Sequence, residues 1–150
     1  YHAVIALNIL NSFSCFVPGV PKPQGSKSVS RSGHLYDSNA RELKPWRLAI
    51  AKAIRARYPK LVIDEAVKLT VVFYFERPAS HFNKSGLKGS SPKAMQTKPD
   101  LDKLIRAVGD GLSVDAGLLK DDSRISSIKA EKQYCERQEV PGALIVLSSL

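Results

Sequence analysis

The residues of this sequence best suited to chemistry are six aspartates that lie between positions 100 and 122: Asp100, Asp102, Asp110, Asp115, Asp121 and Asp122. The chain has 14 Asp and Glu against 23 Lys and Arg, so this window is an acidic exception in a protein of net charge +9. Short carboxylates gathered in a basic chain indicate a cation site within a phosphate-binding surface. Aspartate is also favoured at helix caps and turns, so composition leaves both interpretations open.

The spacing of Asp100 and Asp102 limits what the two can do together. In a regular helix, side chains at i and i+2 point about 200° apart and cannot hold one ion. In extended backbone they point the same way. A shared cation therefore requires Asp100 before a helix and Asp102 in its first turn. The structural alternative makes Asp100 the N-cap and Asp102 an acid favoured by the helix dipole.

Asp121 and Asp122 add a second acidic point about 20 residues further on, before an expected strand. Neighbouring residues of a strand point to opposite faces, so we expect only one of the two to join Asp100 and Asp102. Three carboxylates held together repel one another unless a cation lies between them, and oxygen ligands favour Mg²⁺. Arg106, one turn after Asp102, can hold the aspartates or contact a phosphate, or it makes an ordinary i,i+4 surface pair.

The positive charge is concentrated in three segments. Residues 1–36 contain no acid, residues 41–60 hold seven basic residues and one acid, and residues 77–98 hold five basic residues and no acid. Such segments predict contacts with the backbone of a nucleic acid. The candidates for these contacts are Lys22, Lys27, Arg31, Arg47, Lys84, Lys88, Lys93, Lys98 and Lys103.

The elements that must position these residues follow from the apolar pattern. Strands are expected over residues 13–17, 66–76, 125–134 and 143–150. The strand at 66–76 is apolar on both faces, which places it inside the sheet. One helix is expected to begin near residue 39 or 45 and end at 58, with Trp46 in the core. A second covers 100–112, where Gly109 and Gly111 are expected to end it.

Two segments are expected to be loops. Residues 18–34 are rich in Pro, Gly and Ser, and we interpret them as a basic arm on a DNA backbone rather than a solvated loop. Residues 77–98 show no period, and loops of this length are usually functional or disordered. We expect this second loop to be mobile without DNA.

Several classes of protein are excluded by composition. Two cysteines and three scattered histidines cannot make a disulfide framework or a four-ligand zinc site. Residues 3–17 are apolar but are interrupted by Asn and Ser, so neither a membrane span nor a signal peptide is expected. The length of 150 residues suits one domain over residues 13–150, with residues 1–12 as an N-terminal extension of uncertain role, in the reduced cytosol.

Two motifs around the aspartates resemble those of a known family. Residues 98–112 read Lys98-Pro-Asp100-Leu-Asp102-Lys-Leu-Ile-Arg106-Ala-Val-Gly-Asp110-Gly-Leu, and residues 119–125 read Leu-Lys-Asp121-Asp122-Ser-Arg-Ile. Together they resemble the signature of RusA-type Holliday junction resolvases, which are small dimeric Mg²⁺-dependent endodeoxyribonucleases of bacteria and prophages. Weaker similarity at residues 16–27 and 43–47 extends the resemblance over about residues 13 to 148.

The resemblance implies an α/β fold of the two-layer α+β type, with a mixed sheet of about four strands and two main helices. It implies catalytic, metal-binding carboxylates at Asp100, Asp102 and Asp122, with Asp121 as the alternative third ligand, and Mn²⁺ as a substitute for Mg²⁺. Arg106 stands where the family usually has Lys. Because arginine does not titrate, this change favours phosphate binding over proton transfer.

The resemblance also implies the substrate and the assembly. A symmetric homodimer would make paired cuts by phosphodiester hydrolysis in two opposed strands of a four-way junction, in DNA recombination and repair. We expect it in the cytoplasm of a bacterial or phage-infected cell, at the nucleoid, with no membrane partner and no small-molecule cofactor.

Two other functions remain compatible with the residues. One is a non-catalytic basic module that binds nucleic acid, in which the aspartates are caps and turns. The other is a broader nuclease that acts on flaps or other branched DNA. Metal-dependent cutting separates the first from an enzyme, and a panel of DNA substrates separates the second from a junction resolvase.

Overall fold

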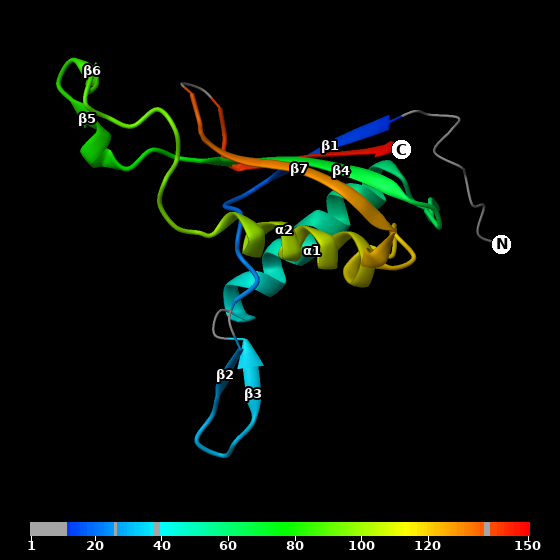
Figure 1. The fold of residues 1–150 in the computed structure, drawn as a ribbon. Coiled ribbons are helices and arrows are strands. Elements are labelled where there is room, and N and C mark those ends of the chain that lie inside the picture. The colour runs from blue at the N-terminus through cyan, green and yellow to red at the C-terminus, as the bar shows by residue number, and fades with distance from the viewer. Residues whose placement is uncertain (1–11, 26, 38–39, 137–138) are drawn as a thin grey trace.

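Two helices cover one face of a four-stranded sheet (Figure 1). The computed structural model describes residues 12–25, 27–37, 40–136 and 139–150. The strands of the sheet are β1 (Ser12–Pro18), β4 (Val67–Phe75), β7 (Ile125–Tyr134) and β8 (Gly142–Ser149). The helices are α1 (Ala40–Arg57) and α2 (Leu101–Asp110). These elements confirm the predicted two-layer α+β fold class, its four strands and its two main helices.

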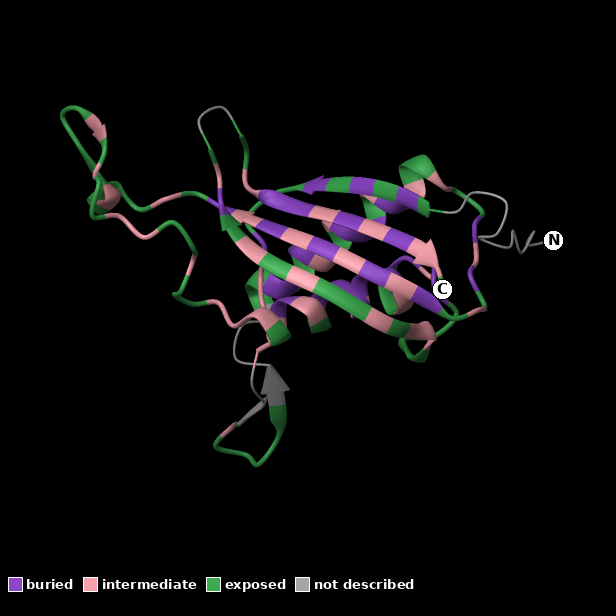
Figure 2. Ribbon diagram, turned by 45° about the horizontal axis from the view of Figure 1, so that its top comes forward, coloured by how far each residue is buried: buried purple, intermediate pink, exposed green. Residues whose placement is uncertain are grey.

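The order of the sheet is β1–β8–β4–β7, so β4 is an interior strand, as predicted. It pairs antiparallel with β8 and parallel with β7. A parallel pair requires a crossover connection, and the segment that contains α2 supplies it. Along β4, buried side chains alternate with half-buried ones, because the helices cover only one face of the sheet (Figure 2).

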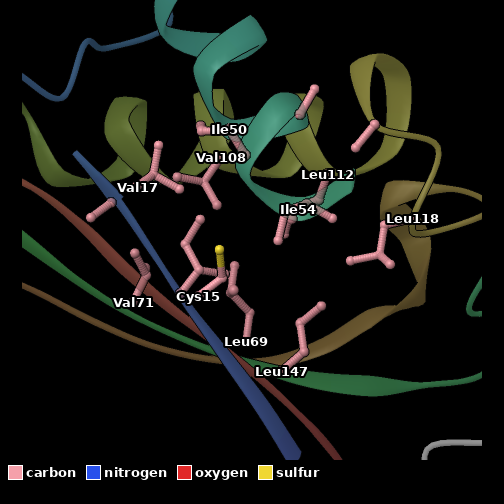
Figure 3. Packing of buried hydrophobic residues seen from close by; sticks show 14 of the residues in the cluster. Cys15, Val17, Ile50, Ile54, Leu69, Val71, Val108, Leu112, Leu118 and Leu147 are labelled. Carbon is pink, nitrogen blue, oxygen red and sulfur yellow. The ribbon is translucent and has the colours of Figure 1, made fainter. Parts of the chain in front are cut away.

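The core lies between this sheet and the two helices (Figure 3). Val17 from β1 and Val71 from β4 belong to the same core cluster as Ile50 and Ile54 of α1, and all four side chains are fully buried (Figure 3). Trp46 is 4% exposed, which confirms that it is a core residue. Among the described residues, no helix is both long enough and apolar enough to cross a membrane.

One short hairpin begins in the first predicted loop and ends just after it, and another lies within the second predicted loop. Sequence reasoning missed both hairpins. The segment after β1 holds β2 (Lys27–Val29) and β3 (Leu35–Asp37). The segment after β4 holds η2 (Ala79–His81), β5 (Phe82–Asn83) and β6 (Gly86–Leu87). Strands of two or three residues are too short to show an alternating pattern. The mobility of residues 77–98 remains a prediction, and residues 1–11 of the predicted extension lie outside the described residues.

The α-helix α2 ends at Asp110 with Gly111 as its C-cap residue, as expected, but the helical path of the chain does not stop there. The chain continues from Gly111 through a π-helical turn, η3 (Gly111–Asp115). Arg47 of α1 holds this turn by an ion pair with Asp115 at 2.6 Å. A Cβ on Gly111 would lie 3.1 Å from a side-chain carbon of Ile50, so the glycine allows the two helical segments to approach closely.

Gly142 at the start of β8 lies in the tightest contact of this kind. A Cβ placed there would overlap the carbonyl oxygen of Val17 and the ring of Phe16. Gly142→Ala is therefore expected to lower the free energy of unfolding by about 1–3 kcal/mol, the range for overpacked sites. Urea unfolding measures this loss. Gly89→Ala is the matched control, because nothing lies within 4 Å of a Cβ at Gly89; equal stability of the two variants would contradict the prediction.

Candidate active site

Asp100 and Asp102 lie at the start of α2. Asp100 is the N-cap residue, with φ −69° and ψ 136°, and its side chain makes no capping hydrogen bond. Asp102 follows in the first helical turn and is exposed. This is the geometry that two carboxylates at i and i+2 need in order to approach one cation. The carboxylate of Asp100 therefore does not cap the helix and remains able to bind a cation.

The carboxylate of Asp100 lies between two lysines. Lys98 Nζ donates to its Oδ1 at 2.8 Å, and Lys103 Nζ lies 3.4 Å from its Oδ2. The hydrogen bond from Lys98, more than any other contact, holds the pKa of Asp100 below its usual range. Asp100 is therefore ionised at neutral pH, the state that binds a cation.

Lys98→Gln is expected to raise the pKa of Asp100, because it removes the largest cause of the depression. The carboxyl group of Asp100 would then take up its proton at a higher pH than in the unchanged protein. NMR titration of the side-chain carboxyl carbon measures the shift. Lys93→Gln makes the same charge change at an exposed position of the same segment and should leave Asp100 unaffected. Identical titration of Asp100 in both variants would contradict the assignment.

Backbone contacts fix the start of α2 against the rest of the fold. Lys132 Nζ, from β7, donates to the carbonyl oxygens of Thr97 at 2.6 Å and Pro99 at 2.9 Å. The Gln24 backbone N–H donates to the carbonyl oxygen of Lys103 at 3.0 Å. Sequence reasoning missed Lys132, since a half-buried lysine in a strand carries no local signal of this role.

A groove of about 530 Å³ opens beside Asp100. Its apolar lining residues include Val20, Pro23 and Phe75. Three lysines line it as well: Lys22, Lys98 and Lys103. Since the three lysines outnumber the acids Glu42 and Asp100 in its lining, the groove suits an anionic chain that presents phosphate next to the carboxylates.

Asp121 and Asp122 have different surroundings. Asp121 is the N-cap of the short helix η4 (Asp122–Arg124) and accepts a hydrogen bond from the Ser123 N–H at 2.9 Å. Hydrogen bonding from Ser123 holds the pKa of Asp121 below its usual range. Asp122 is exposed in the single turn of η4, and its side chain forms a hydrogen bond with that of Asp121. Because the Asp121 carboxylate caps η4, Asp122 is the carboxylate of the two that the helix itself does not use.

The structure does not bring Asp122 to Asp100 and Asp102 within one chain. The start of α2 lies beside Lys132 of β7, whereas a Cβ on Gly109, near the end of α2, would lie 4.0 Å from Ile125 at the start of β7. At 3.3 Å per residue, β7 spans roughly 23 Å between those two residues. Accordingly, no group of three potential metal ligands occurs in the part of the chain that the structure describes.

The predicted DNA contacts fall into two groups. Arg31, Lys84, Lys93 and Lys98 are exposed, and Lys88 is half-buried. Arg106 is exposed as well and makes no ion pair with Asp102 in the described structure. Arg47 instead joins α1 to Asp110 and Asp115, and Lys22 lies 3.7 Å from Glu42. The Arg47 guanidinium is thus already engaged in the fold, and the side chain of Lys27 lies outside the described residues.

The fold and the site together define a class of protein: a basic α+β protein in which two acidic residues and three lysines line a groove suited to a nucleic-acid backbone. Comparison with known families sharpens this class. Residues 18–144 match the family described as Endodeoxyribonuclease RusA, so the chain belongs to the RusA endodeoxyribonuclease family. It is a hydrolase that acts on DNA, from a family that resolves Holliday junctions. No curated protein sequence matches the chain.

Proposed function

We propose that this chain is a Mg²⁺-dependent, homodimeric enzyme that resolves Holliday junctions in recombination and repair by paired cuts in two opposed strands. The carrying observation is the extended Asp100 beside the exposed, first-turn Asp102, next to a lysine-lined groove. The family match supports branched DNA as the substrate. We place this activity in the cytoplasm of a bacterial or phage-infected cell.

The donor chemistry of the site fits a divalent cation. Asp100 has a lowered pKa and no capping bond, and Asp102 is exposed, so both can present carboxylate oxygens. Oxygen ligands of this kind suit Mg²⁺, and Mn²⁺ as its substitute. When bound, such an ion lowers the pKa of a coordinated water and neutralises charge that develops on the phosphodiester.

The protein's own side chains would position the substrate. Lys22, Lys98 and Lys103 line the groove, and on DNA binding they would exchange their contacts with Glu42 and Asp100 for the phosphates that flank the cleaved bond. Arg106 lies one turn beyond Asp102, and its guanidinium can donate two parallel hydrogen bonds to the reacting phosphate and stabilise its charge. The Asp102 carboxylate can accept a hydrogen bond from the attacking water and orient it.

Homodimerisation would supply the missing carboxylate. Because Asp122 lies at the far end of α2 from Asp100, it cannot complete a three-carboxylate site in its own chain. In a two-fold dimer in which the two copies of α2 lie antiparallel, the C-terminal end of one helix lies beside the N-terminal end of the other. Asp122 of one subunit would then lie near Asp100 and Asp102 of the other. We propose that Asp122 of the partner subunit completes the site. A junction with near two-fold symmetry would then receive two equivalent sites.

Labelled four-way junction, flap and linear duplex, incubated side by side with Mg²⁺, with Mn²⁺ and with EDTA, test the proposed function. The expected result is a pair of symmetric cuts in the junction with either metal, no cuts in EDTA, and much slower cutting of flap and duplex. Equal cutting of flaps would instead indicate the broader nuclease. Binding to the junction without cuts at any metal concentration would contradict the proposal and indicate the non-catalytic module.

A further inference from the structure

The β5–β6 hairpin projects away from the sheet, on the long connection between β4 and α2 (Figure 1). Phe82 and Leu87 are paired directly across it, and their exposed fractions are 46% and 54%. Neither residue belongs to the core. An apolar pair held outward on a projecting arm is a feature of contact sites, because it has no role in the packing of its own chain.

The tip of this hairpin has a defined turn. Asn83 Oδ1 accepts a hydrogen bond from the Ser85 N–H at 2.9 Å, which closes an Asx turn. Gly86 follows with φ of +113°, a conformation that favours glycine. The turn therefore holds Phe82 and Leu87 side by side.

The base of the arm is fixed to the sheet. The Arg77 guanidinium lies 4.5 Å from the ring centroid of Tyr134, the buried last residue of β7, and donates to the Pro92 carbonyl oxygen at 2.8 Å. The His81 ring packs edge-on against the same tyrosine at 5.3 Å, and its carbonyl oxygen accepts a hydrogen bond from Ser91 Oγ at 2.8 Å. These contacts join the outgoing and returning limbs to each other and to the end of β7, so the base of the arm has a defined position on the sheet.

The positive charge around the tip of the hairpin favours an anionic partner. Lys84 and Lys88 flank the apolar pair, and residues 77–98 contain no acid. Neither lysine makes an ion pair with a described residue, so both charges are available to phosphates. The returning limb leads along the chain to Lys98 and Asp100, so the hairpin and the carboxylate site belong to the same connection between β4 and β7.

We propose that Phe82 and Leu87 form an apolar wedge that inserts against unstacked bases at the branch point of the DNA, while Lys84 and Lys88 hold the neighbouring phosphates. This inference rests on the proposed function, because a branch point exposes base faces that a continuous duplex keeps stacked. Apolar side chains that enter a base step and aromatic rings that stack on a free base are both established modes of recognition.

A four-way junction with 2-aminopurine at the branch point tests the wedge, since this base fluoresces when it is unstacked. Binding is measured in EDTA, so that the DNA stays intact. The unchanged protein should raise the fluorescence. Phe82→Ser should abolish most of the rise and weaken junction binding by at least about fivefold, the effect of losing one base–aromatic stack, without weakening binding to linear duplex. Leu87→Ser should act in the same direction, and Phe82→Trp should retain the rise.

Val140→Ser is the matched control, because Val140 is apolar, 56% exposed and outside the arm. It should leave fluorescence and affinity unchanged. A protein that cuts junctions normally but whose Phe82→Ser variant gives the full rise would overturn the wedge and leave the proposed function standing. Failure of the unchanged protein to cut any junction would overturn both. Conversion of a dimer to a monomer by Phe82→Ser, seen by light scattering, would overturn the wedge in favour of an interface between copies.

Discussion

Asp102→Asn is expected to lower the rate of junction cleavage by at least about 100-fold, the usual effect of removing one group that stabilises charge in the transition state. The amide keeps the size of the side chain but loses the negative charge that would hold a divalent cation. Asp102 is exposed and makes no ion pair in the described structure, so the fold should be unaffected. Single-turnover cleavage of a labelled junction measures the effect.

Junction binding in EDTA should survive this substitution, because contacts between lysines or arginines and phosphates supply most of the affinity. Glu131→Gln is the matched control: it removes one negative charge from an exposed position on β7, outside the groove, and should cleave normally. Normal cleavage by Asp102→Asn would be incompatible with the assigned site. Loss of binding together with cleavage would point to a damaged fold instead.

Mixing two inactive variants is expected to restore activity, and this is the sharpest test of the dimeric site. Asp102→Asn and Asp122→Asn should each be inactive alone. In a mixed dimer, one of the two composite sites combines an intact Asp100–Asp102 pair with an intact Asp122 of the partner subunit. An equal mixture, allowed to exchange subunits, should recover about one quarter of the complete sites, since about half of the dimers are mixed and each has one such site.

The products and a control mixture make this result specific. Mixed dimers should nick one strand of a junction without resolving it, because each has a single complete site. A mixture of Asp100→Asn with Asp102→Asn should stay inactive, since both substitutions damage the same part of the site. Absence of recovery in the first mixture would show that the three carboxylates act within one chain, which would contradict the separation of Asp122 from Asp100 by the length of α2.

The secondary structure followed closely from local patterns. The alternation around β4 and the apolar stripe of α1 repeat over many residues, so the sequence alone predicted their bounds well. The β5–β6 hairpin has two residues in each strand, which is too few for any period to appear. The π-helical turn after Gly111 could not be foreseen either, because the ion pair from Arg47 that holds it comes from a distant helix.

The candidate site also has a part that the sequence predicted and a part that it did not. The spacing of Asp100 and Asp102 required one residue before the helix and one in its first turn, and the structure has this arrangement. Arg47 shows the opposite case, since a basic residue predicted to contact DNA is engaged by Asp110 and Asp115. Charge and residue type are visible in a sequence, whereas the partner of a charged side chain depends on segments far apart along the chain.

The sequence by itself determined the polyanionic partner, the ionisable groups of the site and the type of each long element, because composition, residue spacing and periodicity are local properties. Only the tertiary structure decided which of those groups meet. β4 and β7 are parallel, so the connection between them must return along the face of the sheet, and α2 forms this return. The residues before α2 therefore lie at one end of the sheet, and the residues before β7 lie at the other. This topology separates Asp122 from Asp100, although the sequence had suggested a single cluster.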